Sequence, residues 1–84
     1  MPVTVNILFF AQARELAGKS EAEFTIETPI AYSDLVKRIV DEFSLTELQD
    51  HLILALNSDW VWDQEILNLK PADEIAVIPP LSGG

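Results

Sequence analysis

The sequence contains no cysteine, and this absence excludes several classes of function. Disulfide scaffolds, thiolate zinc sites, iron–sulfur clusters and thiol nucleophiles all require cysteine. Basic residues are also scarce, because five lysines and arginines stand against 14 aspartates and glutamates, which leaves a formal net charge of −9. Binding to nucleic acid requires basic clusters that neutralise phosphates, so no nucleic-acid partner is expected. The acidity indicates either solubility alone or a protein partner with a complementary basic surface.

Long hydrophobic runs are missing as well. The longest are Ile7 to Ala11 and Leu52 to Leu56, and both are too short to span a bilayer. The first ten residues, MPVTVNILFF, lack a basic region and a cleavage site, so they are typical of a strand rather than a signal peptide. The single histidine, His51, has no second histidine or cysteine with which to complete a metal site. We therefore expect a cytoplasmic protein with neither a membrane partner nor a metal.

The hydrophobic pattern predicts one main helix and five strands in a single domain of 84 residues. Residues 32–43 have helical spacing, and their apolar stripe consists of Leu35, Val36, Ile39, Val40 and Phe43. Short helical turns are expected at residues 12–17, ending at Gly18, and at residues 46–50. Alternation and short apolar runs between turn residues predict strands at residues 3–10, 21–27, 52–56, 60–62 and 74–78.

This order of elements, β-β-α-β-β with a short connecting element or two, predicts an α+β fold of the ubiquitin-like β-grasp type. We expect a mixed sheet with one main helix packed on one face, and the last strand parallel to the first at the centre of the sheet. Residues 1–78 would form this domain, and residues 79–84 would form an extended C-terminal tail with the sequence PPLSGG.

One helix covers only one face of such a sheet, so the other face is left uncovered. If Val5, Ile7 and Phe9 face the helix, alternation directs their neighbours outward. The expected outward set is Leu8, Phe10, Ala76 and Ile78, with Trp60 added from a nearby turn. A contiguous apolar patch marks a partner, so we predict a partner-binding surface here. The alternative is that packing within a twisted sheet hides part of the patch.

The C-terminal residues have properties that suit insertion into a partner. Pro79 and Pro80 favour an extended exit from the last strand and cannot extend the ladder. The four residues after them, Leu81, Ser82, Gly83 and Gly84, reach at most roughly 14 Å further. The two glycines carry no Cβ, so the terminal carboxylate can pass through a channel as narrow as a backbone. A terminal pair of glycines is weak evidence alone, but it is stronger after a double proline that ends a β-grasp strand.

The chain resembles the MoaD-like sulfur carriers, the small subunits of molybdopterin synthase, over nearly its whole length. The segments that carry the resemblance are Phe9-Phe10-Ala11, Arg14-Glu15-Leu16 with Gly18, Ala55-Leu56-Asn57 with Val61, Asp73-Glu74-Ile75-Ala76, Pro79-Pro80 and Ser82-Gly83-Gly84. Two positions depart from the family pattern. Ala72 stands where glycine is usual, and Ala31 stands where a capping serine or threonine is common.

The resemblance implies that the Gly84 carboxylate is adenylated with ATP by an E1-like adenylyltransferase and converted to a thiocarboxylate by a sulfur donor system. The tail would then enter the large subunit of molybdopterin synthase and donate sulfur to cyclic pyranopterin monophosphate. It implies a non-catalytic subunit with no permanently bound cofactor, because the catalytic side chains belong to the partners. The resemblance also makes Arg14 a candidate partner contact, although a surface ion pair explains it equally well.

Three alternatives remain open at this point. A thiamine-pathway (ThiS-like) sulfur carrier has the same fold and tail, but the residues from Phe9 to Gly18 do not match its pattern. A ubiquitin-like modifier conjugated to lysines is the second alternative. An acyl carrier protein, which is also small and acidic, is the third, and the strand-rich N-terminal region contradicts its all-helical fold.

Overall fold

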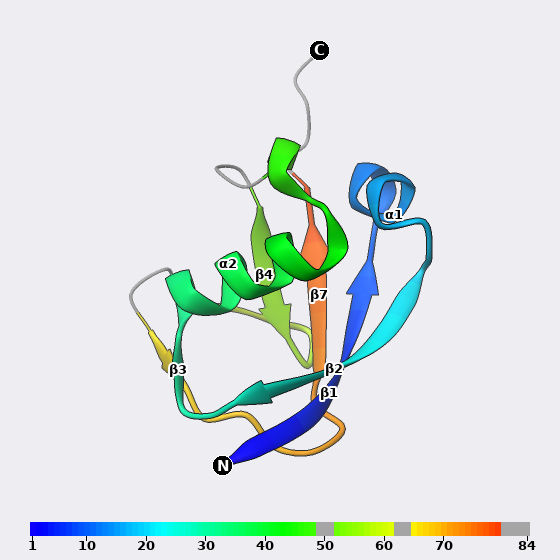
Figure 1. The fold of residues 1–84 in the computed structure, drawn as a ribbon. Helices are drawn as coiled ribbons and strands as arrows, with labels where there is room; N and C mark the ends of the chain where they lie inside the picture. The colour runs from blue at the N-terminus through cyan, green and yellow to red at the C-terminus, as the bar shows by residue number, and fades with distance from the viewer. Residues whose placement is uncertain (49–51, 62–64, 80–84) are drawn as a thin grey trace.

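The computed structural model describes residues 1–48, 52–61 and 65–79 (Figure 1). Its elements in chain order are β1 (Pro2–Phe9), α1 (Ala11–Ala17), β2 (Glu21–Glu27), β3 (Ile30–Ala31), α2 (Tyr32–Phe43), the 3₁₀ turn η1 (Thr46–Leu48), β4 (Ile53–Leu56), β5 (Asp59–Trp60), β6 (Ile66–Leu67) and β7 (Glu74–Ile78). No helix among these residues is long and apolar enough to cross a membrane.

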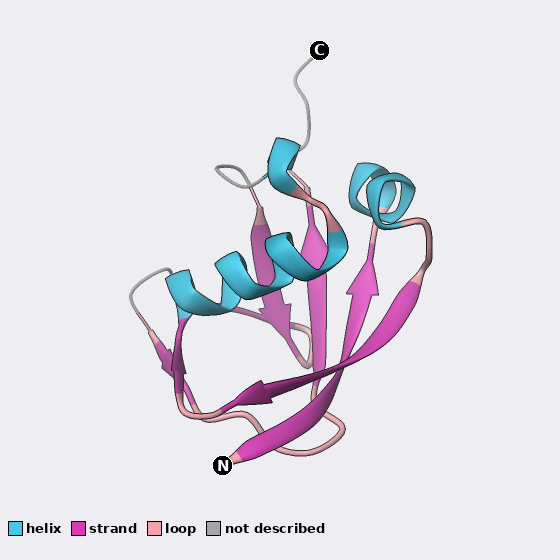
Figure 2. Cartoon of the chain, viewed as in Figure 1, coloured by secondary structure: helices cyan, strands magenta, loops and turns pink. Residues whose placement is uncertain are grey.

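Five strands form a mixed sheet in the order β2-β1-β7-β4-β5. The central strands β1 and β7 run parallel, and the other neighbours in the sheet are antiparallel. Helix α2 crosses one face of this sheet, as Figures 1 and 2 show. The prediction of an α+β, β-grasp fold with one main helix on one face is confirmed.

The core lies between α2 and the sheet. Helix α2 spans the predicted residues and buries Leu35, Ile39 and Val40, whereas the other two members of the predicted stripe are only partly buried. Val5, Ile7 and Phe9 of β1 are at most 2% exposed, as predicted, and the inward-facing side chains of β7 match them. The N-terminal cap of α2, Ala31, makes no side-chain hydrogen bond, so capping does not stabilise this helix. Its stability comes mainly from burial of the apolar stripe against the sheet.

Strand β1 ends one residue earlier than the sequence pattern predicts. Phe10, the last residue of the predicted strand, is the N-cap of α1, although its backbone is still extended (φ −120°, ψ 147°). Helix α1 ends as predicted at Gly18, which is left-handed and donates its backbone N–H to the carbonyl of Arg14. The alternation of β1 therefore continues through Phe10, and its backbone N–H still donates to the carbonyl of Val77 in β7 (3.3 Å).

The structure also contains a second sheet that the sequence analysis missed. Strands β3 and β6 pair antiparallel over two residues each. Strands this short carry no measurable period, so the sequence pattern does not reveal them. Thr28 ties this region together, since its hydroxyl donates to the carbonyl of Leu67 (3.3 Å) and accepts from the backbone N–H of Leu69 (2.8 Å).

Residues 70–73 form a turn before β7, closed by the backbone N–H of Asp73, which donates to the carbonyl of Lys70 (3.1 Å), and Ala72 adopts the left-handed conformation with φ 70°. Asn57 holds this turn, because it donates to a carboxylate oxygen of Asp73 (3.0 Å) and accepts from the backbone N–H of Glu74 (2.9 Å). The resemblance to MoaD-like carriers predicts glycine at position 72, and here alanine adopts the left-handed backbone conformation that favours glycine. The Ala72 departure therefore leaves the turn intact.

Candidate functional site: an apolar surface where the chain leaves the sheet

The strand register decides which side chains share the sheet face opposite α2. Leu8 pairs with Ala76, and Ala76 pairs in turn with Ala55, so the three lie in one row across the sheet. Residues directly opposite each other on paired strands have their side chains on the same face. The register extends the row by Trp60 and adds a second row with Ile53 and Ile78. We call Leu8, Phe10, Ile53, Ala55, Trp60, Ala76 and Ile78 the apolar outer surface.

Several of these side chains are open to solvent. Trp60 is 62% exposed, Phe10 47% and Ile53 41%, whereas Leu8 and Ile78 are partly buried. Of the five exposed large hydrophobic residues in the described part of the chain, three lie on this surface, and the others are Met1 and Ile66. The predicted register and the predicted outward residues of β1 and β7 are confirmed. That these residues bind a partner stays a prediction.

The sequence analysis missed Ile53 as a member of this surface. The segment Leu52 to Leu56 is apolar at every position, so it has no alternation that would show which side chains face outward. The register of β4 against β7 resolves this question, because Ile53 lies directly opposite the outward-facing Ile78. No signal within the segment itself distinguishes its two faces.

The opposite end of the same face is polar. The hydroxyls of Thr4 and Thr25 are hydrogen-bonded across β1 and β2 (2.9 Å). Asn6 and Glu74, which pair across β1 and β7, follow on the next row towards the apolar outer surface. The apolar side chains are therefore gathered at one end of the face rather than scattered over it, which is typical of a partner-binding surface.

The chain leaves β7 at this apolar end of the sheet, and α1 lies at the same end (Figure 1). Pro79, the first residue of the predicted tail, is buried against the domain. The other predicted tail residues, Pro80, Leu81, Ser82, Gly83 and Gly84, lie outside the described residues, as do Trp62 and His51. The predicted extension of the tail and its role stay predictions.

Arg14, the remaining predicted contact, is exposed on α1. Its helix lies at the ends of β1 and β7, and the inward side of the helix consists of Ala13, which is fully buried, with Leu16 and Ala17 partly buried. The position places Arg14 at the apolar end of the sheet, so the structure is compatible with a partner contact. That role stays a prediction.

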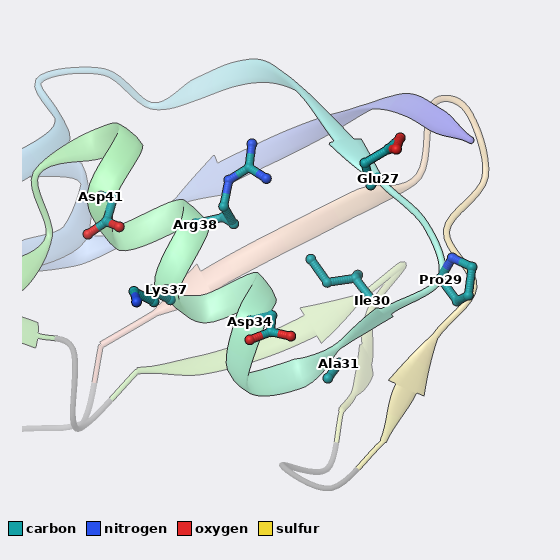
Figure 3. Close-up of a pocket in the computed structure, with 8 residues that line it drawn as sticks. All are labelled: Glu27, Pro29, Ile30, Ala31, Asp34, Lys37, Arg38 and Asp41. Atoms are coloured by element: carbon teal, nitrogen blue, oxygen red, sulfur yellow. The ribbon is translucent and has the colours of Figure 1, made fainter.

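A hollow of about 440 Å³ lies on the helix side of the molecule (Figure 3). Asp34, Lys37, Arg38 and Asp41 line it from α2, and Glu27 lines it from the end of β2. The Arg38 guanidinium also lies over the Phe24 ring, 5.6 Å from its centroid. These charged side chains are all exposed, and those on α2 place opposite charges three or four residues apart, as on an ordinary solvated helix surface. The sequence analysis did not predict this hollow.

No metal-binding cluster of three or more His, Asp or Glu side chains exists among residues 1–48, 52–61 and 65–79. The same part of the chain has no buried polar or charged residue.

Comparisons with known proteins show the family to which this chain belongs. The model of the ThiS family matches residues 7–84. The molybdopterin synthase sulfur carrier subunit of Drosophila yakuba is 45% identical over 83 residues, which cover 98% of this chain and 92% of that protein. The chain belongs to the family of molybdopterin synthase sulfur carrier subunits.

Solved structures of similar proteins support the same family. A protein described as molybdopterin converting factor subunit 1 from Pyrococcus furiosus is 26% identical, with a TM-score of 0.72 over 94% of this chain and 99% of that one. A complex of subunits 1 and 2 of the molybdopterin-converting factor from Helicobacter pylori contains a chain that is 25% identical. Its TM-score is 0.63, over 98% of this chain and 100% of that chain. This similar chain from Helicobacter pylori is therefore known in complex with a second subunit.

Proposed function

We propose that this chain is the sulfur carrier of molybdopterin synthase, with the Gly84 carboxyl group as its reactive group. An E1-like adenylyltransferase activates the carboxylate, which attacks the α-phosphate of ATP and releases pyrophosphate. A sulfur donor system then displaces AMP and leaves a thiocarboxylate. The large subunit of molybdopterin synthase receives the tail, and the sulfur passes to cyclic pyranopterin monophosphate in building the dithiolene.

The observation that carries this proposal is the position of the apolar outer surface. It lies at the end of the sheet where β7 delivers the chain to its C-terminal residues. A partner that covers Phe10, Ile53 and Trp60 is therefore within reach of the tail that starts at Pro79. The carrier supplies the docking surface and the reacting group in one contact, and the Helicobacter pylori complex supports the large subunit as that partner.

The chemistry of the chain fits this role. A carboxylate is a poor electrophile until it becomes an acyl-phosphate anhydride, and a thiocarboxylate is a sulfur nucleophile that needs no cysteine. The chain has no cysteine, and its tail after Ile78 carries no charged side chain, so the terminal group is the only charge that entry into a dry channel would desolvate. The proposal includes no permanently bound cofactor, because the activating enzyme binds the ATP. It places the reaction in the cytoplasm, where ATP is available.

The test is a reconstitution with the activating enzyme, a sulfur source, the large subunit and cyclic pyranopterin monophosphate. We expect the intact mass of the carrier to change by one oxygen-for-sulfur exchange, and dithiolene to form when the large subunit is added. Deletion of Gly84, or addition of one residue after it, should abolish sulfur transfer, because small misplacements of a reacting group are costly. Neither change should alter the thermal melt of the domain. Normal dithiolene formation by either variant would refute the proposal.

A thiamine-pathway sulfur carrier is the second candidate, because the matching family model is that of the ThiS family. Both functions require the same thiocarboxylate, so the mass change alone does not separate them. Dithiolene formation with the purified large subunit separates the two functions, because a thiamine-pathway carrier does not donate sulfur through that subunit. Recovery of lysine-linked conjugates in place of a thiocarboxylate would instead indicate a ubiquitin-like modifier.

A further inference from the structure

Carboxylates border the apolar outer surface on the same face of the sheet. Glu21 lies directly beside Leu8, at the β2 edge of the apolar row. One row further from the tail, Glu23 and Glu74 lie on either side of Asn6. All three glutamates are exposed, and their register places them on the outer face. We call Glu21, Glu23 and Glu74 the acidic border.

No basic side chain balances these charges on the outer face that the structure describes. The sequence has five lysines and arginines, and all of them lie in other elements. They are Arg14 on α1, Lys19 after it, Lys37 and Arg38 on α2, and Lys70 in the turn before β7. The positive charges are therefore confined to the helices and loops, whereas the strands carry only negative charge on this face.

The acidic border does not stabilise the fold. Glu23 and Glu74 are separated by two strand spacings, about 10 Å, and like charges at this distance repel each other weakly. The repulsion is only partly screened, because the Debye length is about 8 Å at physiological ionic strength. Each glutamate is exposed and could be replaced by a neutral residue without loss of packing. The stability of the fold therefore does not explain the acidic border, and its effect is expected in association with a partner.

We propose that the acidic border steers a partner with a basic rim onto the apolar outer surface. This inference rests on the proposed function, because it adds an electrostatic rim to the same docking site and specifies the chemistry of the partner. Charges at the rim of an interface mainly change the association rate and its salt dependence, whereas the apolar centre sets the dissociation rate. The partner surface that meets β2 and the start of β7 should therefore be rich in lysine and arginine.

The test measures association of the carrier with the purified large subunit by stopped-flow fluorescence or surface plasmon resonance. The variant Glu21→Lys/Glu23→Lys reverses two charges of the border. We expect its association rate constant to fall about tenfold at about 0.01 M ionic strength, where the Debye length is about 30 Å. The difference should shrink to less than about twofold at about 1 M salt, and the dissociation rate constant should change less than about twofold throughout.

The matched control is Asp41→Lys/Glu42→Lys, which makes the same change in net charge in the last turn of α2, on the helix side of the molecule. We expect wild-type kinetics from it, and unchanged thermal melts from both double variants. Equal slowing by both would mean that net charge alone acts, and no slowing by either would mean that the border does not steer, so each result would overturn the inference. Failure of the wild-type carrier to bind the large subunit would instead overturn the proposed function.

Discussion

Replacement of Phe10 by aspartate tests whether the apolar outer surface binds the partner. The side chain is 47% exposed, so its loss removes only about half of the 1.5–3 kcal/mol that a fully buried phenylalanine contributes to folding. A carboxylate directly before α1 faces the positive end of that helix and recovers roughly 0.3–1 kcal/mol. We therefore expect Phe10→Asp to lower the free energy of unfolding by at most about 1 kcal/mol, and the domain to stay folded.

The neighbouring residue gives the contrasting result. Phe9 is 2% exposed, and its ring packs edge-on against Phe43 with centroids 4.9 Å apart. Truncation of a buried phenylalanine costs about 3–5 kcal/mol, and an unpaired buried charge costs more. A domain of this length has a total stability of about 4–13 kcal/mol. Phe9→Asp should therefore unfold most of the protein, although it is the same substitution one position earlier.

The effect of Phe10→Asp on binding should be much larger than its effect on folding. A partner that covers the exposed half of the ring removes roughly 70–120 Å² from water, which is worth about 2–3 kcal/mol. The dissociation constant for the large subunit should therefore rise roughly 30- to 150-fold. Calorimetric titration against the large subunit measures this change, and circular-dichroism melts measure stability.

Two controls separate the possible outcomes. Phe10→Leu keeps an apolar side chain and should bind within about fivefold of the wild type, because only part of the apolar area is lost. Ser33→Asp places the same charge on exposed α2, which covers the other face of the sheet, and should leave the dissociation constant unchanged. Wild-type affinity of Phe10→Asp would refute the docking surface, and equal unfolding of the Phe9 and Phe10 variants would refute the register.

Three further predictions concern the tail and the turn before β7. Gly83→Val should leave the melting temperature unchanged but block dithiolene formation, because a β-branched side chain widens a segment that must pass a narrow channel. Gly83→Ala should have a milder effect, and full activity of the valine variant would contradict the prediction. Ala72→Gly should raise the melting temperature by roughly 2–8 °C, since the left-handed backbone at φ 70° is strained for alanine, and a lower value would show that the strain is absent. Asn57→Ala should cost about 1–2 kcal/mol in denaturant unfolding, because it removes the bonds to Asp73 and Glu74; an unchanged midpoint would show that these bonds contribute nothing.

The sequence by itself determined the elements that have a clear hydrophobic period. The bounds of α2 and β7 agree with the prediction, because a period of 3.6 or 2 residues is a local property of the chain. Once β1 and β7 were expected to lie side by side, their alternation also placed Leu8, Phe10 and Ile78 on the outer face. The family resemblance came from short motifs, and the comparisons confirm it.

Only the tertiary structure decided the features that depend on pairing between distant segments. Ile53 faces outward because β4 lies in one particular register against β7, and its own apolar segment has no period that distinguishes the two faces. Strands β3 and β6 form only because each meets the other, and the acidic border exists only because β2 and β7 both flank β1. Local periodicity therefore determines which residues of a strand share a side, whereas long-range pairing determines which strands bring their sides together into one surface.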